Sequence, residues 1–385
     1  MGAPSLTVYW DERFREYDLG PEHPFSERSR ALAARLLALQ DGSESSGAIE
    51  WVRTVGAASR AELETFHRPE YLDFVERASA FDEPILLDMG DTPSFRGCFE
   101  AAGRIVEGAI RGIDRAWESS HPAFHPAGGL HHARPERASG FCIFNDVAVA
   151  VGRAVRAGRR VAYLDIDAHH GDGVMYGFYD SGRVLDIDFH QDGRTIFPGT
   201  GAASETGRGD GAGSKVNVPL PPASGDEALL PIFRRLVPPL LRSFRPDVIV
   251  LQHGVDGHIG DGLARLQYTP GAYAEIDRAL LALARELAGG RMLVTGGGGY
   301  RASAVSRVLA RTGLLLAGGD PPPDDAALPE GWRTEYRETI GERAPSTWAD
   351  TEVVEPSRWH AEDEERLIAE LERGLGMRFP AVRSS

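Results

Sequence analysis

The sequence predicts an α/β protein built on a mostly parallel, multi-stranded sheet with helices on both faces. Two observations lead to this fold class. Short apolar segments alternate with longer segments of helical periodicity, which is typical of a parallel sheet covered by helices. Chemically active side chains directly follow several of the apolar segments, and in α/β proteins ligands bind beyond the carboxyl ends of the strands.

We expect strands near six residues, which are, in chain order, Thr7, Val161, Val184, Val216, Asp247 and Met292. Helical patterns cover residues 26–39, 145–157, 226–243 and 270–287. Gly, Pro and Asp are frequent in residues 318–329, which predicts a loop. Beyond this loop, residues 361–375 have the charged, amphipathic pattern of a surface helix.

The segment from Tyr163 to Asp172 is the most informative part of the chain, because it places three carboxylates and two imidazoles at the end of an apolar strand. Asp167 and His169 are two residues apart, so in an extended segment they point to the same side and could bind one divalent cation. The alternative is a turn in which Asp and Gly supply only turn chemistry and the histidines are incidental.

Three further clusters favour the metal site. His131 and His132 lie in a Gly-rich loop, and paired imidazoles suit proton transfer near neutral pH. The apolar run that starts at Asp247 leads to Asp256, a possible third ligand, and the run that starts at Met292 leads through four glycines to Tyr300. Each cluster alone could be an ordinary turn. Buried carboxylates without partners are costly, however, so convergence of the three strand ends implies a cation or paired imidazoles.

These clusters belong to a longer series of motifs. In order they are Tyr17-Asp-Leu-Gly-Pro-Glu-His-Pro-Phe25, Gly90-Asp-Thr-Pro93, Pro126-Ala-Gly-Gly-Leu-His-His-Ala133, Ser139-Gly-Phe-Cys-Ile-Phe-Asn-Asp146, Asp165-Ile-Asp-Ala-His-His-Gly-Asp-Gly173, Ile196-Phe-Pro-Gly-Thr-Gly201, Gln252-His-Gly-Val-Asp256 and Gly296-Gly-Gly-Gly-Tyr300. With this content and order, which cover roughly residues 6–345, the chain resembles the histone deacetylase superfamily and looks most like its bacterial acetoin-utilisation branch.

The resemblance implies a zinc-dependent hydrolase that removes acyl groups, chiefly acetyl, from the amines of lysine side chains. Asp167, His169 and Asp256 would hold the metal, with positions left for water and the amide oxygen. Zinc is the expected ion. Iron(II) or cobalt could replace it, because the sequence defines the ligand types and not the metal that is available.

The resemblance also implies the catalytic groups. Asp165 would orient His131, and Asp172 would orient His132. We expect His132 to act as general base and then as general acid towards the leaving amine, with His131 mainly electrostatic. Tyr300 would donate a hydrogen bond to the developing oxyanion.

For the substrate, the resemblance implies a narrow channel in which Gly140 and Phe141 face Phe197, with Leu263 at the rim. Asp91 matches a residue at the mouth that binds substrate backbone amides in relatives, although Asp followed by Thr-Pro is also good turn chemistry. Gly262 departs from the proline often found after the aspartate that matches Asp261, which affects the conformation of the rim loop.

Relatives bind potassium near the aspartate that matches Asp165, with backbone carbonyls near Asp188 and Phe189. The sequence itself has no signature for such an ion, so we expect it from the resemblance alone. Five other histidines are expected to be loop or packing residues, namely His121, His125, His190, His253 and His258.

The motifs extend almost from end to end, so we expect one catalytic domain over residues 1–345 and a C-terminal extension over residues 346–385. Two cysteines give no disulfide framework. We find no apolar run long enough for a secretion signal or a membrane span, so we expect a cytoplasmic protein. The net charge of −15 disfavours nucleic acid and favours cationic substrates. The helix at residues 361–375 could contact a second subunit in a homodimer.

Three alternatives to protein-lysine deacetylation remain open. The first is deacylation of acetylated polyamines, another small amide or longer acyl groups. The second is an arginase-like manganese hydrolase. Such enzymes bind two metals and need a cluster of aspartates, whereas here Asp256 is followed by Gly257 and His258. The third is a protein that binds acyl-lysine without cleaving it, although intact His131, His132 and Tyr300 argue against this.

Overall fold

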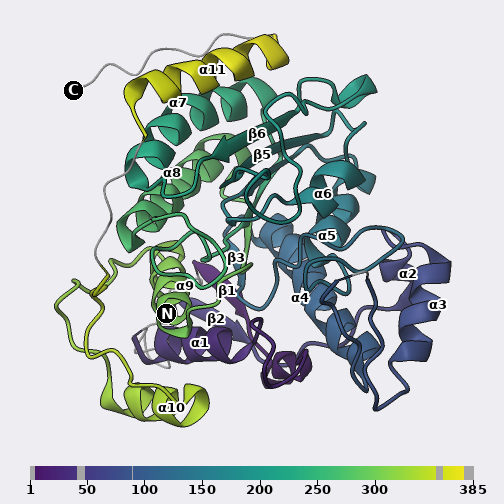
Figure 1. Cartoon of the computed structure of the whole chain (residues 1–385), viewed down its shortest axis with the longest axis vertical. Helices are drawn as coiled ribbons and strands as arrows, with labels where there is room; N and C mark the ends of the chain where they lie inside the picture. The colour runs from purple at the N-terminus through teal and green to yellow at the C-terminus, as the bar shows by residue number, and fades with distance from the viewer. Residues whose placement is uncertain (1–4, 41–47, 89, 353–358, 377–385) are drawn as a thin grey trace.

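Eight parallel strands form one sheet at the centre of the computed structural model, which describes residues 5–40, 48–88, 90–352 and 359–376 (Figure 1). Their order across the sheet is β2-β1-β3-β8-β7-β4-β5-β6. In chain order the strands are β1 (Leu6–Tyr9), β2 (Ile49–Val52), β3 (Ala123–His125), β4 (Val161–Asp165), β5 (Val184–Gln191), β6 (Lys215–Leu220), β7 (Val248–Gln252) and β8 (Met292–Thr295).

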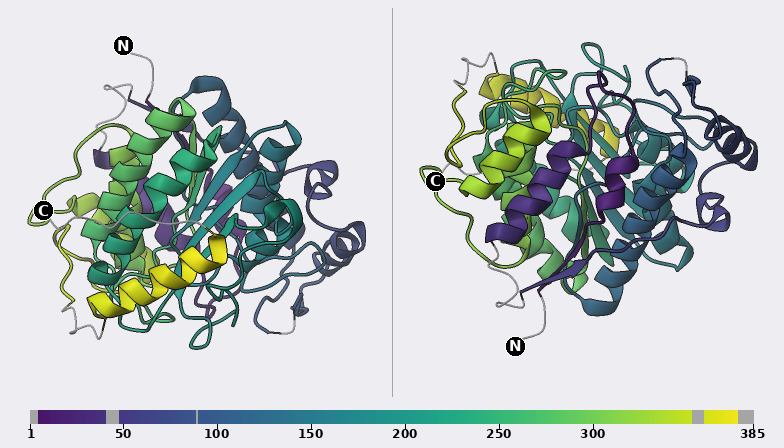
Figure 2. Two further views of the ribbon diagram at one scale, coloured as in Figure 1. Left: turned by 90° about the horizontal axis from the view of Figure 1, so that it is seen from above. Right: turned by 90° about the horizontal axis from the view of Figure 1, so that it is seen from below.

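Helices cover both faces of this sheet, as the two views of Figure 2 show. On one side lie α1 (Arg28–Gln40), α7 (Asp226–Phe244), α8 (Pro270–Ala288) and α9 (Ala302–Leu316), with α10 (Glu330–Ile340) against α1 and α11 (Ala361–Leu375) against α7. On the other side lie α3 (Pro69–Ala78), α4 (Cys98–Ser119) and α5 (Asp146–Arg156), with α6 (Asp172–Gly177) against α5. Short helical turns occur at α2 (Arg60–Leu63), η1 (Glu12–Glu16) and η2 (Gly209–Gly211).

The strands bury both of their faces. Successive side chains of a strand point to opposite faces, so Leu164 belongs to the core under α7, α8 and α9, while Tyr163 belongs to the core under α4 and α5. This explains why the central strands β4, β7 and β8 are almost entirely apolar rather than alternating. The predicted fold class is therefore confirmed.

The last residues of four neighbouring strands form one row across the middle of the sheet. His125 of β3 pairs with Thr295 of β8, Thr295 with Gln252 of β7, and Gln252 with Asp165 of β4. The chain leaves all four strands at this edge, so the segments that follow them meet above the centre of the sheet. These segments carry most of the residues that the sequence singled out.

All six expected strands are present, as β1, β4, β5, β6, β7 and β8, and the expected helices are α1, α5, α7, α8 and α11. The sequence patterns did not assign β2 and β3, which have only four and three residues, nor the long helix α4. Helix α4 is rich in glycine, which lowers helix propensity. At Gly108 a Cβ atom would lie 2.5 Å from the His125 ring, so glycine lets α4 pack closely on the sheet.

The C-terminal part of the chain packs onto the α/β body. Leu367, Ile368 and Leu371 of α11 are buried in the same core as α7 and β6, so the apolar side of α11 is covered by this chain. Arg307 of α9 donates to the Trp348 carbonyl (3.1 Å). A homodimer through α11 and a division at residue 345 stay predictions. Among the described residues, no helix is both long and apolar enough to span a membrane.

Candidate metal centre and active site

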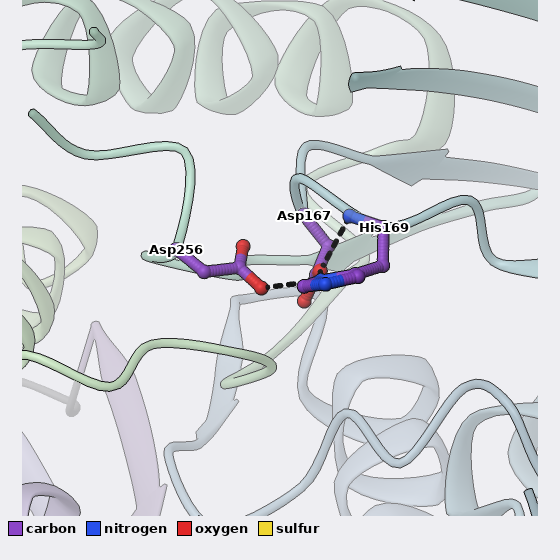
Figure 3. A group of neighbouring side chains, drawn as sticks. All are labelled: Asp167, His169 and Asp256. Atoms are coloured by element: carbon purple, nitrogen blue, oxygen red, sulfur yellow. Dashed lines mark hydrogen bonds and ion pairs between the residues drawn. The ribbon is translucent and has the colours of Figure 1, made fainter. Parts of the chain in front are cut away.

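Asp167 and His169 follow β4, and Asp256 follows the neighbouring strand β7. Their possible ligand atoms all lie within 4.8 Å of one another, and Figure 3 shows the two carboxylates and the imidazole turned towards one another. His169 Nδ1 lies 2.8 Å from Asp256 Oδ2 and 3.2 Å from Asp167 Oδ1. All three side chains are buried. The strand ends thus bring together the three residues expected to bind metal.

The surroundings of these side chains fit a divalent cation. Asp167 Oδ2 accepts hydrogen bonds from the Gly298 amide (2.6 Å) and Gln252 Nε2 (2.9 Å), and Asp256 Oδ1 accepts one from the Ala168 amide (2.7 Å). Burial and the adjacent Asp167 carboxylate raise the pKa of Asp256 to about 7. Two oriented, mutually repelling carboxylates and one imidazole form a donor set that a bound cation would stabilise.

The glycine run after β8 permits this close arrangement. A Cβ atom on Gly298 would collide with the carboxylate of Asp256 and would lie 2.8 Å from Asp167 Oδ2. Only glycine therefore allows the backbone to pass directly beside both carboxylates.

His131 and His132 form a second cluster beside these three side chains. His131 Nδ1 lies 2.7 Å from Asp165 Oδ2, and His132 Nδ1 lies 2.8 Å from Asp172 Oδ1. The Nε2 atoms of the two imidazoles are 3.0 Å apart. Because both Nδ1 atoms face carboxylates and donate to them, the contact between the Nε2 atoms needs one further proton.

The two imidazoles differ in basicity. Burial disfavours the charged form of both, but at His131 the carboxylates of Asp165 and Asp167 outweigh it and raise the pKa to about 9. At His132, burial and the charge of His131 outweigh Asp172 and lower the pKa to about 4. At neutral pH the shared proton therefore belongs to His131, and His132 is neutral.

The carboxylates behind the imidazoles also differ. Asp165 accepts a hydrogen bond from the neutral Tyr163 hydroxyl and another from the Asp167 amide (3.0 Å). Asp172 shares its second oxygen with the Arg134 guanidinium (2.6 Å). Arg134 therefore neutralises part of the negative charge of Asp172, which would otherwise stabilise a proton on His132. The Tyr163 hydroxyl is uncharged, so the full negative charge of Asp165 can stabilise a proton on His131.

A cavity of about 410 Å³ leads to these groups. It is lined by His23, Pro24, Asp91, His132, Gly140, Phe141, His169, Ile196, Phe197, Leu263 and Tyr300. Phe197 and Leu263 are 47% and 43% exposed, whereas His132 and His169 are buried, so the aromatic and aliphatic side chains form the mouth and the imidazoles the inner end. The rings of Tyr300 and His169 lie 6.4 Å apart. All five residues expected to bind substrate line this cavity.

The sequence did not reveal the roles of several residues of the site. Gln252, the last residue of β7, holds Asp167, and Arg134 holds Asp172. Asp261 accepts hydrogen bonds from the backbone amides of both Tyr300 (2.9 Å) and Leu263 (2.9 Å), and so joins the rim loop to the tyrosine. Tyr163 could have been found, because it is two residues before Asp165 in the same strand and points to the same side. The others depend on contacts between distant segments.

Asp188, near the expected potassium site, lies opposite Asp165 in adjacent strands. Its Oδ2 accepts a hydrogen bond from the Gly171 amide (2.6 Å), while its buried Oδ1 has no hydrogen-bond partner among the described residues. Burial and the neighbouring carboxylates Asp165 and Asp186 raise the pKa of Asp188 well above its usual range. A buried, unpartnered carboxylate oxygen fits a bound cation.

The five histidines expected to be loop or packing residues contact other parts of the protein. Their partners are Thr7 for His121 (3.0 Å), the Ile105 carbonyl for His125 (3.0 Å), the Gln191 carbonyl for His190 (2.9 Å), Asp277 for His253 (3.1 Å) and Asp350 for His258 (2.7 Å).

Comparison with known proteins agrees with this geometry. Residues 23–314 match the family model of the histone deacetylase domain. The chain is 36% identical to the acetoin utilization protein AcuC of Bacillus subtilis (strain 168), with 91% of each chain covered. It is 34% identical to AcuC of Staphylococcus xylosus, with 89% of this chain and 90% of the relative covered.

Solved structures give the same result. The crystal structure of the HDA15 HD domain superposes with a TM-score of 0.72 at 29% sequence identity, covering 82% of this chain and 91% of that one. The shared fold and the family match over most of the chain agree with the order of the motifs around the site. This chain therefore belongs to the histone deacetylase family of hydrolases, within its AcuC-like branch.

Proposed function

We propose that this protein is a zinc-dependent deacylase that hydrolyses the amide bond of acetyl-lysine, or of lysine with another short acyl group, in proteins. One observation carries the proposal. The set Asp167, His169 and Asp256 lies beside the carboxylate-backed pair His131 and His132 at the inner end of a cavity with aromatic walls. Metal ligands, a proton acceptor and a channel for an extended apolar side chain are what this hydrolysis needs.

Asp167, His169 and Asp256 would hold the ion. A divalent cation at this position polarises the scissile carbonyl and lowers the pKa of water towards about 7. Two carboxylates and an imidazole suit zinc, and they also accept iron(II) or cobalt. Among the described residues, this is the only group of three or more His, Cys, Asp or Glu side chains whose ligand atoms are so close together. That favours a one-metal mechanism over an arginase-like one.

His132 is the proposed general base. Its pKa of about 4 leaves the imidazole neutral at pH 7. Its Nε2 accepts the hydrogen bond from His131 in this structure, and it would turn from that contact to take a proton from the attacking water and return it to the nitrogen of the leaving amine. Asp172, bonded to Nδ1, keeps the ring in the tautomer that has its lone pair on Nε2. His131, protonated at this pH, would stabilise the negative charge that develops during the reaction.

Tyr300 is the proposed oxyanion donor. Its amide is tied to Asp261, and its ring lies against Phe141 and His169, at centroid distances of 6.0 and 6.4 Å. Burial and the carboxylates of Asp256 and Asp167 raise the pKa of Tyr300 well above its usual range. The hydroxyl therefore keeps its proton and can donate it in a hydrogen bond.

The walls of the cavity suit the side chain of an acylated lysine. Phe141 and Phe197 would contact the methylene groups of a lysine side chain, and Leu263 would contact them at the rim. Asp91, exposed at the mouth, would accept hydrogen bonds from backbone amides of a polypeptide. The net charge of −15 also favours acetylated polyamines, so a small cationic amide is the second candidate substrate.

Potassium belongs to the proposal as a structural ion. Asp165 and Asp188, together with carbonyl groups near Phe189, would hold it. The unpartnered buried oxygen of Asp188 supports this assignment.

A competition experiment tests the substrate class. Zinc-reconstituted protein is given acetyl-lysine peptides and acetylated polyamines together, and release of each free amine is measured. We expect a higher kcat/KM for the peptides, and Asp91→Ala should lower it for peptides more than for polyamines. A preference for polyamines would move the assignment to the small-amide candidate. Cleavage of neither by metal-loaded protein would favour a protein that only binds acyl-lysine.

A further inference from the structure

Phe141, one wall of the cavity, occupies an unfavourable backbone conformation. Ser139 and Cys142 exchange two backbone hydrogen bonds, of 3.1 and 2.9 Å, which makes residues 139–142 a two-residue hairpin turn. Both central residues have positive φ, 51° at Gly140 and 69° at Phe141. Gly, Asn and Asp are preferred at such positions, because a Cβ atom disfavours the left-handed region. Something outside the turn must therefore hold Phe141 there.

The position of this turn determines the width of the cavity. A Cβ atom on Gly140 would lie 2.6 Å from the His132 ring and 2.7 Å from the Phe197 ring. The turn thus packs directly against the proposed general base and against the opposite wall. A shift of the turn would change the space between Phe141 and Phe197 and the contact with His132.

Thr92 holds the turn from one side. The Phe141 amide donates to Thr92 Oγ1 (3.0 Å), and the same hydroxyl donates to Asp88 Oδ2 (2.6 Å). Asp88 Oδ1 accepts the amides of Gly90 (3.0 Å) and Thr92 (3.1 Å), so the carboxylate also fixes the loop that presents the hydroxyl. Thr92 is fully buried, so its hydroxyl is shielded from water, whereas the bond between Asp88 and the Gly90 amide is exposed.

Tyr17 holds the turn from the other side. Its hydroxyl donates to the Phe141 carbonyl (2.6 Å) and accepts the Ile143 amide (3.0 Å). The Tyr17 ring is itself fixed by edge contacts with Phe25 and Phe95, at 5.9 and 6.0 Å. Both polar groups of the Phe141 backbone are therefore bound by side chains from segments far away in the sequence.

The same two segments reach the mouth of the cavity. Asp91 precedes Thr92, and its carbonyl lies 3.1 Å from His23 Nε2. The His23 ring packs perpendicular to the Phe141 ring at 4.5 Å. Because Phe25 N donates to His23 Nδ1 (3.1 Å), the proton of His23 is on Nε2 and is donated to Asp91. The backbone of Asp91 is thus linked to the channel wall through His23, by one hydrogen bond and one ring contact.

We propose that Thr92 and Tyr17 are positioning residues that hold Phe141 in its left-handed conformation, and that they thereby set how tightly the channel binds the acylated side chain. The effect on binding rests on the function proposed above, whereas the effect on the turn does not. A purely structural role would change stability without separating KM from kcat.

Kinetics of matched variants test the effect on binding. Thr92→Val is nearly isosteric and removes the hydroxyl, while Thr92→Ser keeps it. With an acetyl-lysine peptide, we expect Thr92→Val to raise KM about tenfold with kcat changed less than about threefold, and Thr92→Ser to stay within about twofold of wild type. Tyr17→Phe should also raise KM. An unchanged KM in Thr92→Val, or a Thr92→Ser variant as impaired as Thr92→Val, would overturn the proposal.

Amide hydrogen exchange tests the effect on the turn without any substrate. Exchange of the Phe141 amide, followed in a peptide that spans residues 139–144, should be at least about tenfold faster in Thr92→Val and unchanged in Thr92→Ser. Equal protection in all three proteins would overturn the proposal even if they are inactive. A different result is also informative: wild-type protein could cleave no acyl-lysine while exchange is still faster in Thr92→Val. That result would contradict the proposed function and the binding effect derived from it, but not the role of Thr92 in the turn.

Discussion

The Nε2 atoms of His131 and His132 lie 3.0 Å apart, and each imidazole is backed by its own carboxylate. The pair nevertheless is not symmetric. Asp165 accepts a hydrogen bond from the neutral hydroxyl of Tyr163, whereas Asp172 accepts one from the cationic guanidinium of Arg134. The surroundings therefore assign the proton to one imidazole and the lone pair to the other, which separates the electrostatic role from that of the base.

Tyr300→Phe should lower kcat about 100- to 1000-fold, because loss of one oxyanion donor typically costs about 3–4 kcal/mol of transition-state stabilisation. KM for an acetyl-lysine peptide should change little, since the ring and its contact with Phe141 are kept. Steady-state kinetics measure both, with bound zinc as the control. Turnover equal to that of wild type would remove Tyr300 from the mechanism.

Gly298→Ala should abolish tight metal binding, because the new methyl group collides with the Asp256 carboxylate and crowds Asp167. Gly262→Ala is the matched control, since a Cβ atom there meets no atom within 4 Å. We expect zinc affinity to fall at least about tenfold in the first variant and to change less than about twofold in the second. Competition with a chromophoric chelator measures both affinities. Equal affinities would contradict the placement of the metal.

Arg134→Met should shift the acid limb of the kcat/KM profile to higher pH. Despite burial, His132 and Arg134 lower the pKa of Asp172. Without the guanidinium, the carboxylate supports a proton on His132 more strongly and raises its pKa. Because the base must be neutral, activity would then be lost at a higher pH as the pH falls. Arg134→Lys, which keeps the charge, should resemble wild type. If the acid limb of the kcat/KM profile lies at the same pH in Arg134→Met as in wild type, His132 is not the base.

His67 should make the protein less stable in mild acid. It is buried, with Nδ1 donating to the Arg134 carbonyl (3.0 Å) and Nε2 accepting the Asn145 amide (3.0 Å). Burial lowers its pKa to about 3. Between pH 6.5 and 3 only the unfolded chain binds this proton, so stability falls as the pH falls through that range, by about 2 kcal/mol at pH 5 relative to pH 7.

His67→Gln provides the control for this effect, because glutamine does not titrate. The free energy of unfolding, measured with urea at pH 7 and pH 5, should fall less in His67→Gln than in wild type. The difference between the two proteins isolates the contribution of His67, since other titrating groups are common to both. Identical losses in both proteins would show that His67 is not held neutral by the fold.

The fold class and the candidate metal site were accessible from the sequence because both depend on local patterns. Asp167 and His169 are two residues apart after an apolar strand, and Asp256 follows another such strand, so one rule about strand ends brings them together. The short strands β2 and β3 carry too few residues for a pattern. Helix α4 was missed because its glycines, such as Gly108, serve packing against the sheet and not helix propensity.

The supporting residues could not be predicted in the same way. Gln252 holds the candidate metal ligand Asp167, Arg134 holds the carboxylate of Asp172, and Asp261 holds the amide of Tyr300. Each of these residues acts on a partner from a distant segment. The difference in basicity between adjacent His131 and His132 likewise depends on which buried charges face each ring. Such effects follow from packing, and a single sequence has no period or spacing that shows them.

The central claim is that one metal ion, held by Asp167, His169 and Asp256, and the adjacent histidine pair together hydrolyse an acyl-lysine amide. It is tested most directly by titrating metal-free protein with zinc while measuring free amine released from an acetyl-lysine peptide, with Asp256→Ala alongside. We predict that activity rises to a plateau at one zinc per chain and that Asp256→Ala stays inactive at the same zinc concentration. Activity without metal, or an Asp256→Ala variant as active as wild type, would contradict the account.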